Sequence, residues 1–253
     1  MKNEIIEHLK KLEIEREIKI LMAIESGSRA WGFPSPDSDY DVRIVFVRKY
    51  NSYLSVGKRK DTIDYFHGEL LDINGWDIRK TLRLLGKSNA TPFEWAQSPM
   101  VYMEEAGFRK SLLEVAALFF NPYHSLNHYK GIAKNSFSKI TDGDQIKLKT
   151  LFYVLRPLFA IQWIQKNKTI PPMNIFELME AVEEKEIIEK VKELITKKAT
   201  ANEDYVYQIH HQIKNYITAF FEDLENMKMD KKELPEKEIL DTYFRNLLNQ
   251  FAR

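Results

Sequence analysis

The sequence of 253 residues contains no cysteine and only nine glycines and nine prolines. The lack of cysteine excludes disulfides, thiolate zinc sites and a cysteine nucleophile. No stretch approaches the roughly 18 apolar residues of a transmembrane helix, and the charged N-terminus lacks a secretory pattern. We therefore expect a soluble, cytoplasmic protein with no membrane partner.

The sequence also has almost no excess of one sign of charge, since the formal net charge is only +1. Indiscriminate binding to polyanions is therefore not expected, because such binding depends on neutralising phosphates. Basic residues nevertheless outnumber acidic ones within 130–168, and Arg79, Lys80, Arg83 and Lys87 form an acid-free patch on one predicted helix. Either patch suits the phosphates of a nucleotide or of RNA, and the alternative is that both simply solvate helix faces.

Two predicted strands flank a turn that is rich in glycine, serine, proline and aspartate. Residues 20–25 form an apolar run behind a charged amphipathic segment, and residues 42–47 are rich in β-branched and aromatic side chains. The turn between them therefore lies at an end or an edge of a sheet.

Asp39 and Asp41 open the second of these strands. Side chains alternate along a strand, so the two carboxylates share one face, and such proximity is costly unless a cation lies between them. Magnesium binds through a few carboxylates and substrate phosphates. Gly27 and Ser28 allow backbone and hydroxyl donors to approach phosphate, with Arg29 beside them. The pattern predicts a magnesium-bound triphosphate site, and an acidic loop without a metal is the alternative.

The longer run from residue 27 to 43, Gly-Ser-Arg-Ala-Trp-Gly-Phe-x-Ser-x-Asp-Ser-Asp-Tyr-Asp-Val-Arg, resembles a known signature. It resembles the nucleotide-binding motif of the DNA polymerase beta superfamily of nucleotidyltransferases, and in particular the RNA-ligase-associated branch. Further blocks similar to that branch lie at 72–80, 87–89, 94–95, 98–99 and 153–157. The resemblance covers most of the first 175 residues. It implies a polymerase-beta-like catalytic domain with a mixed sheet, followed by helices.

The superfamily usually carries a third carboxylate on a neighbouring strand. We predict that this residue is Asp72, because it lies between apolar neighbours in a predicted strand at 69–74. Asp77 is more typical of a helix N-cap. Glu69 is expected to be a charge at the strand edge, and Asp64 is a further alternative.

The chain is predicted to divide near Asn121 into an α+β domain, 1–120, and an all-helical domain, 121–253. A helix predicted at 144–165 carries Lys149, Tyr153 and Arg156 at spacings that place them on one face. We predict that these three side chains contact the nucleotide. Core packing is the alternative, above all for Tyr153.

The leading hypothesis is a magnesium-dependent nucleotidyltransferase that uses ATP. The resemblance implies that Asp39, Asp41 and Asp72 are both the catalytic residues and the metal ligands. Nucleotide binding is expected from six residues, namely Gly27, Ser28, Arg29, Lys149, Tyr153 and Arg156. The acceptor hydroxyl is left open among an RNA end, a protein and a small molecule. The alternative is a nucleotide-binding or antitoxin-like regulatory partner without turnover.

Overall fold

The structure, a computed structural model, describes residues 1–57, 59–68, 70–140, 144–227 and 231–252. Contacts group the chain into two compact units. Unit 1 comprises residues 1–30, 39–120 and 234–253, and unit 2 comprises residues 31–38 and 121–233. The division into domains 1–120 and 121–253 stays a prediction.

Unit 1 is built on a five-stranded mixed sheet with the order β3-β4-β2-β1-β5. Strands β2 and β4 are parallel, and the other neighbouring pairs are antiparallel. The strands predicted at 20–25 and 42–47 are confirmed as the cores of β1 and β2. The strand bounds are Ile18–Ser26 (β1), Tyr40–Arg48 (β2), Thr62–His67 (β3), Leu71–Asp77 (β4) and Val101–Glu104 (β5).

The strand predicted at 69–74 is displaced, because β4 continues through Gly75 to Asp77. A Cβ atom on Gly75 would lie 2.7 Å from Cγ1 of Ile44 on the neighbouring strand. The glycine therefore marks a close approach between strands instead of a strand end. Glu69, one alternative for the third carboxylate, lies outside the described residues.

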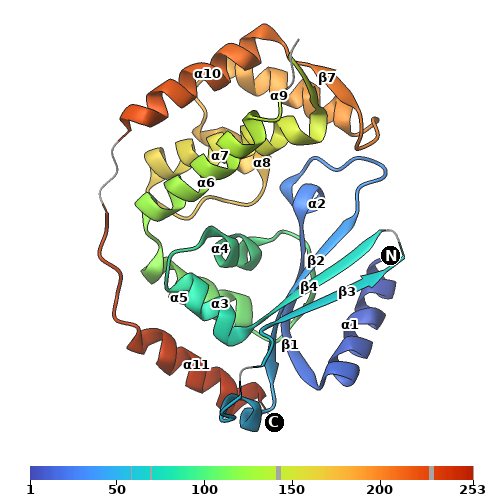
Figure 1. Cartoon of the computed structure of the whole chain (residues 1–253), viewed down its shortest axis with the longest axis vertical. Helices are drawn as coiled ribbons and strands as arrows, with labels where there is room; N and C mark the ends of the chain where they lie inside the picture. Colours follow the sequence, from blue (N-terminus) through green and yellow to red (C-terminus); the bar gives the residue numbers. More distant parts are fainter. Residues whose placement is uncertain (58, 69, 141–143, 228–230, 253) are drawn as a thin grey trace. The chain divides into compact units, whose positions relative to one another are not determined.

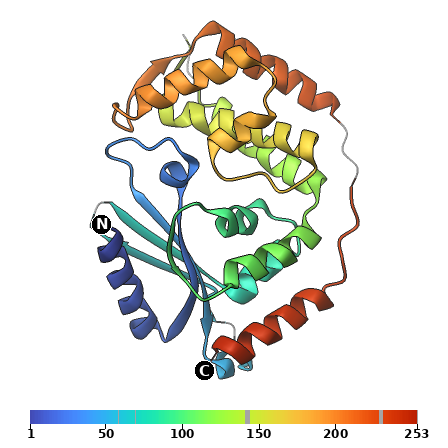
Figure 2. The ribbon, with the colours of Figure 1, turned by 180° about the vertical axis from the view of Figure 1, so that it is seen from behind.

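Helices cover both faces of this sheet (Figure 1, and from behind in Figure 2). On one face α1 (Lys2–Arg16) packs its apolar stripe against β2, where Val42, Ile44 and Phe46 are buried. The other face carries α3 (Ile78–Leu85), α4 (Ala90–Gln97) and α5 (Phe108–Phe119). Because side chains alternate along β2, Asp41 and Arg43 project to the face opposite α1.

The C-terminal helix α11 (Glu238–Phe251) packs against α3 and α5 within unit 1. Leu240 lies so close to Gly86 that a Cβ on the glycine would meet Leu240 Cδ1 at 2.6 Å. The Tyr243 and Ser111 hydroxyl groups are 2.8 Å apart. The chain end is also fixed near the short 3-10 helix Tyr50–Tyr53, since the Tyr50 N–H donates to the Ala252 carbonyl at 3.0 Å.

Unit 2 is mainly helical, as predicted, but it also contains a two-stranded antiparallel sheet of β6 (Gln145–Lys147) and β7 (Val206–Gln208). The helix predicted from residue 144 therefore begins only at Leu148. Among the described residues, no helix combines the length and apolarity needed to cross a membrane. The helical segments are α6 (Pro122–Phe137), α7 (Leu148–Asn167), α8 (Ile175–Leu178), the 3-10 helix Met179–Ala181, α9 (Lys185–Lys198) and α10 (His211–Asn226).

Candidate active site

Two of the predicted acids face each other across neighbouring parallel strands. Asp41 on β2 and Asp72 on β4 are register partners, so their side chains leave the same face of the sheet at the same height. The Arg43 guanidinium bridges them, with Nη2 at 2.9 Å from Asp41 Oδ1 and 3.0 Å from Asp72 Oδ2. All three side chains keep some exposure, at 33% for Asp41, 32% for Asp72 and 19% for Arg43. The structure thus joins two carboxylates around one positive charge.

Gly27 lies beside one of these two carboxylates, that of Asp41. It opens the short helix α2 (Gly27–Trp31) directly after β1, with a φ of +67°. A Cβ atom at this position would lie 2.2 Å from Asp41 Oδ2, so any other residue would force the carboxylate to move. Glycine is therefore required here twice, for its backbone conformation and for the space that it leaves beside Asp41.

Asp39 lies immediately before β2 and is exposed. Its backbone carbonyl accepts a hydrogen bond from Arg29 Nε at 3.1 Å, and the Arg29 guanidinium also lies 4.0 Å from the centre of the Tyr40 ring. Ser28 is buried in α2. Of the predicted residues, Gly27, Ser28 and Arg29 thus lie in α2, and Arg29 contacts Asp39 two residues before Asp41.

A further acid, Glu25, lies fully buried at the end of β1. Its Oε1 accepts the Asp41 backbone N–H at 2.8 Å, and its Oε2 accepts the Tyr102 hydroxyl. Burial raises the pKa of Glu25 to about 7, although these two hydrogen bonds oppose the rise. Glu25 therefore holds the start of β2 in place and sits near the boundary between its neutral and charged forms at neutral pH.

The other candidates for the third carboxylate lie elsewhere. Asp77 is the N-cap of α3, as predicted, and its carboxylate accepts the Arg79 N–H at 2.8 Å. Asp64 is exposed on β3, where it pairs with Lys60 at 3.0 Å and accepts a hydrogen bond from Asn74. Of these acids, Asp72 has the register partner that brings it to Asp41.

The three residues predicted on the second helix all lie in unit 2. Lys149 forms an ion pair with Glu203. Tyr153 packs edge-on against Trp31 with ring centres 5.2 Å apart, and the Arg156 guanidinium lies 4.6 Å from the centre of the Trp31 ring. Arg156 is only 5% exposed, and its Nε donates to the Met173 carbonyl at 3.1 Å. The structure thus gathers Tyr153 and Arg156 around one indole.

The donor set at Asp41 and Asp72 fits a hard divalent cation. Both residues offer carboxylate oxygens, and these oxygens already converge on a positive group. Carboxylate oxygens are the ligands that Mg²⁺ prefers. A second possible group of ligands, Glu4, His8 and His67, has ligand atoms within 4.8 Å of one another, but its imidazoles suit softer transition metals.

Two residues of this site, Glu25 and Arg43, were not predicted from the sequence. Arg43 lies two residues after Asp41, so strand alternation alone places both on one face. Glu25 is a charged residue that closes an apolar run two residues before Gly27. An acid at the end of a buried strand was the available signal, because such a residue must find hydrogen-bond donors nearby.

The mixed sheet, together with the Gly-Ser pair and the Asp-x-Asp pair that follows, defines a nucleotidyltransferase of the polymerase beta type. The profile of the RlaP family, described as the RNA repair pathway DNA polymerase beta family, matches residues 1–246. The chain belongs to this family, which confirms both the resemblance seen in the sequence and the expected class of enzyme.

Similar proteins include "Uncharacterized protein YcgL" of Bacillus subtilis (strain 168), which is 41% identical over 239 residues and is matched over 92% of both chains. Among solved structures, a nucleotidyltransferase-like protein from Exiguobacterium sibiricum 255-15 is 13% identical. That match covers 88% of this chain and 73% of the other chain, with a TM-score of 0.32.

Proposed function

We propose that this nucleotidyltransferase uses magnesium to move a nucleoside monophosphate from ATP to an acceptor hydroxyl, with an RNA end as the acceptor. The observation that carries the proposal is the pair of register partners, Asp41 and Asp72, converging on one cationic group. Carboxylates on adjacent parallel strands, next to a glycine that lets the Asp41 carboxylate lie against the backbone, are suited to a metal-bound triphosphate. The choice of RNA follows from the description of the family.

In this proposal Asp39, Asp41 and Asp72 hold the metal. A magnesium ion held there would supply positive charge to neutralise the α-phosphate and the leaving pyrophosphate. Asp72 also orients the acceptor hydroxyl and accepts its proton. Arg43 gives up at least one of its two carboxylate contacts when the metal binds, because both would compete for the same oxygens.

The remaining predicted residues bind the nucleotide. Gly27 and Ser28 present backbone N–H groups and a hydroxyl to the phosphates, and the Arg29 guanidinium supplies positive charge beside them. Nucleotide contacts are also proposed for Lys149, Tyr153 and Arg156, which all belong to unit 2. Lys149 is the more accessible member of its ion pair with Glu203. Its side chain is 37% exposed, and that of Glu203 is 21% exposed. Because ATP is a cytoplasmic metabolite, the proposal also places the enzyme in the cytoplasm.

The test is transfer of label from α-³²P-ATP to single-stranded RNA, with release of pyrophosphate measured in parallel. We expect transfer by the purified protein that needs Mg²⁺ and is lost in Asp41→Asn. Asp64→Asn is the matched control, because Asp64 is an exposed strand aspartate that pairs with Lys60 away from the Arg43 bridge. Nucleotide binding without pyrophosphate release would instead support the regulatory alternative.

A further inference from the structure

A second cavity lies at the other end of strands β2 and β4. It has a volume of about 470 Å³, and most of its charged lining residues are basic. Arg48 ends β2 seven residues after Asp41, which corresponds to about 23 Å along a strand. Asp77 likewise ends β4, whereas Asp72 is near its beginning. A single nucleotide at the candidate active site therefore cannot fill this cavity. We call it the basic cavity, and it is lined by Arg48, Ser52, Tyr53, Ser55, Val56, Gly57, Arg59, Lys60, Asp61, Asp77, Arg79 and Arg83.

Positive charge exceeds negative charge in the basic cavity. Five of the lining residues are arginines or lysines and two are aspartates, and Lys60 is also paired with Asp64 outside the lining, which leaves an excess of two positive charges. One aspartate, Asp61, is paired with Arg83 at 2.8 Å. Within the described part of the chain, Arg59 takes part in no ion pair. An anionic ligand would compensate this excess.

The second aspartate, Asp77, is a weak counter-charge for these cations. It is buried, with 7% of its side chain exposed, and it accepts hydrogen bonds from the Tyr53 hydroxyl at 3.0 Å and the Arg79 N–H at 2.8 Å. The Arg48 Nε stands 4.0 Å from Asp77 Oδ2, too far for a hydrogen bond. That Nε–H is buried and has no hydrogen-bond partner among the described residues. A buried donor without an acceptor is unfavourable, so the contact between Arg48 and Asp77 compensates the guanidinium charge only weakly.

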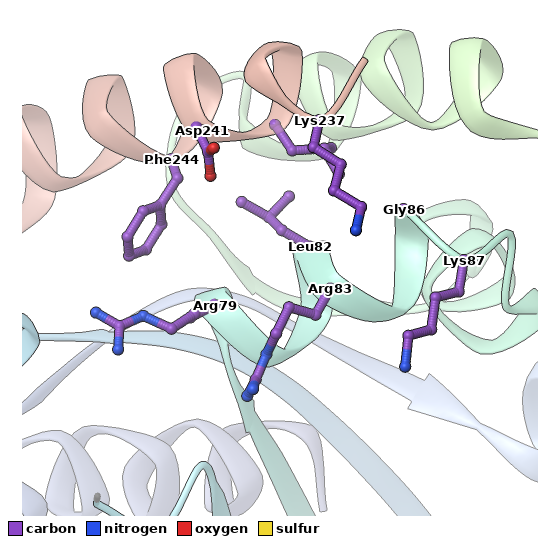
Figure 3. A pocket seen from close by; sticks show the side chains of 9 residues that line it. Arg79, Leu82, Arg83, Gly86, Lys87, Lys237, Asp241 and Phe244 are labelled. Carbon is purple, nitrogen blue, oxygen red and sulfur yellow. The ribbon is translucent and has the colours of Figure 1, made fainter. Parts of the chain in front are cut away.

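An apolar cavity adjoins the basic one and shares Arg79 and Arg83 with it (Figure 3). Its volume is about 240 Å³. Side chains from α3 and α11 line it, and Figure 3 shows the basic side chains of α3 opposite Phe244 of α11. Apolar and aromatic walls beside a concentration of positive charge match a planar apolar group that carries a phosphate. This apolar cavity is lined by Arg79, Leu82, Arg83, Gly86, Lys87, Lys237, Leu240, Asp241 and Phe244.

We propose that the two adjoining cavities bind a nucleotide unit, as a site separate from the candidate active site. Its phosphate lies among Arg48, Arg59 and Arg79, and its base lies against Leu82 and Phe244. The same chemistry is offered by a free nucleotide and by one unit of an RNA strand. The proposal does not depend on the transfer activity, because it rests on a different set of residues at the opposite end of the sheet.

The test is direct binding in the presence of EDTA, which removes metal-dependent binding at the acids. The probes are inorganic phosphate, AMP and a single-stranded RNA of mixed sequence with a 5′-phosphate, each titrated by calorimetry. We expect saturable binding of AMP or RNA that weakens about tenfold or more in Arg59→Glu, since a charge-assisted contact is reversed. Arg59 is exposed and outside regular structure, so the variant should fold.

Lys10→Glu is the matched control, because it makes the same change in net charge on an exposed position of α1. Binding should be unchanged in this control. Tighter binding of RNA than of AMP would identify the strand as the ligand, and equal binding would identify the free nucleotide. Equal losses in Arg59→Glu and Lys10→Glu would overturn the proposal, as would no saturable binding of any probe.

The apolar cavity has its own test in Phe244→Leu, a conservative change that limits loss of packing against Tyr53. We expect weaker binding of AMP or RNA with unchanged binding of inorganic phosphate, because only the base contacts this side chain. A melting temperature close to that of the wild type verifies the fold. Unchanged AMP and RNA affinities would overturn the assignment of the base to this cavity.

Discussion

Arginine and aspartate occur at both ends of strands β2 and β4, but their contacts and burial differ between the two ends. At one end Arg43 contacts both Asp41 and Asp72, and at the other end Arg48 stands 4.0 Å from the buried Asp77. Asp72 keeps 32% exposure whereas Asp77 keeps 7%. Acids therefore dominate the first end and attract a cation, while the second end uses its acid for the fold and leaves arginines in excess. The two ends therefore suit different ligands because their charge balance and burial differ, although their residue types are the same.

The sharpest way to break this comparison is to remove one acid from each end. Asp72→Asn should lower kcat for nucleotide transfer by about 100-fold or more, because the metal loses a ligand and the acceptor loses its base. Asp77→Asn should retain most activity, since asparagine can still cap α3. The rates are measured with labelled ATP at saturating Mg²⁺. Equal losses in the two variants would show that the ends are not functionally distinct.

The buried Glu25 makes the acidic end sensitive to pH. Its pKa is raised from 4.5 to about 7 in the folded protein, so folding favours its protonated form. The stability that it contributes is present below pH 4.5 and is lost as the pH rises through 7. Relative to Glu25→Gln, the free energy of unfolding of the wild type should fall by about 3 kcal/mol over this window.

Urea denaturation of both proteins across the same pH range checks this prediction. Glutamine keeps an acceptor for the Asp41 N–H and cannot ionise, so the variant lacks the contribution of this group to the pH dependence. Parallel curves for the two proteins would contradict the role given to Glu25.

Of the two acids Asp72 and Asp77, the one at the basic end, Asp77, should contribute more to stability. Asp77→Ala removes the N-cap of α3 and leaves the half-buried Tyr53 hydroxyl without this acceptor. We expect a loss of about 2 kcal/mol in the free energy of unfolding. Asp72→Ala, at the partly exposed end, should cost less. The two values come from urea denaturation at one pH, and a larger loss for Asp72→Ala would reverse the comparison.

The smallest expected effect is at Arg43. In Arg43→Leu the two carboxylates lose their shared counter-charge, which should destabilise the metal-free protein by about 1 kcal/mol after screening by solvent. Mg²⁺ should restore more stability to this variant than it adds to the wild type, because the ion replaces the guanidinium. Thermal melts with EDTA and with Mg²⁺ measure this gain in stability. An identical gain in both proteins would contradict the idea that the ion and the Arg43 guanidinium occupy the same position.

Local patterns in the sequence predicted the parts of the fold that depend on local forces. The apolar runs gave β1 and β2, and Asp77 was identified as a helix cap from the pattern that follows it. The prediction that Gly75 ends the strand is wrong, because this glycine accommodates Ile44 of the neighbouring strand. No local pattern contains that contact. The strands β6 and β7 are three residues each, too short for a periodic signal. The packing of α11 onto α3 likewise depends on contacts between distant segments.

The candidate site was predictable to a similar extent. Asp41 and Asp72 could be named because one follows a Gly-Ser motif and the other lies in an apolar strand. Their shared height depends on the register between β2 and β4, which a sequence does not display. The bridge through Arg43 and the buried hydrogen bonds of Glu25 follow from that register and from burial. The roles of Lys149, Tyr153 and Arg156 toward the nucleotide stay a prediction.

The most direct measurement is a crystal structure of the protein with Mg²⁺ and a non-hydrolysable ATP analogue. The account predicts an ion bonded to carboxylate oxygens of Asp41 and Asp72, with Asp39 completing the set and Arg43 released from at least one of them. The triphosphate should lie against Gly27 and Ser28. A nucleotide bound elsewhere, with Arg43 still bridging the two acids, would contradict it.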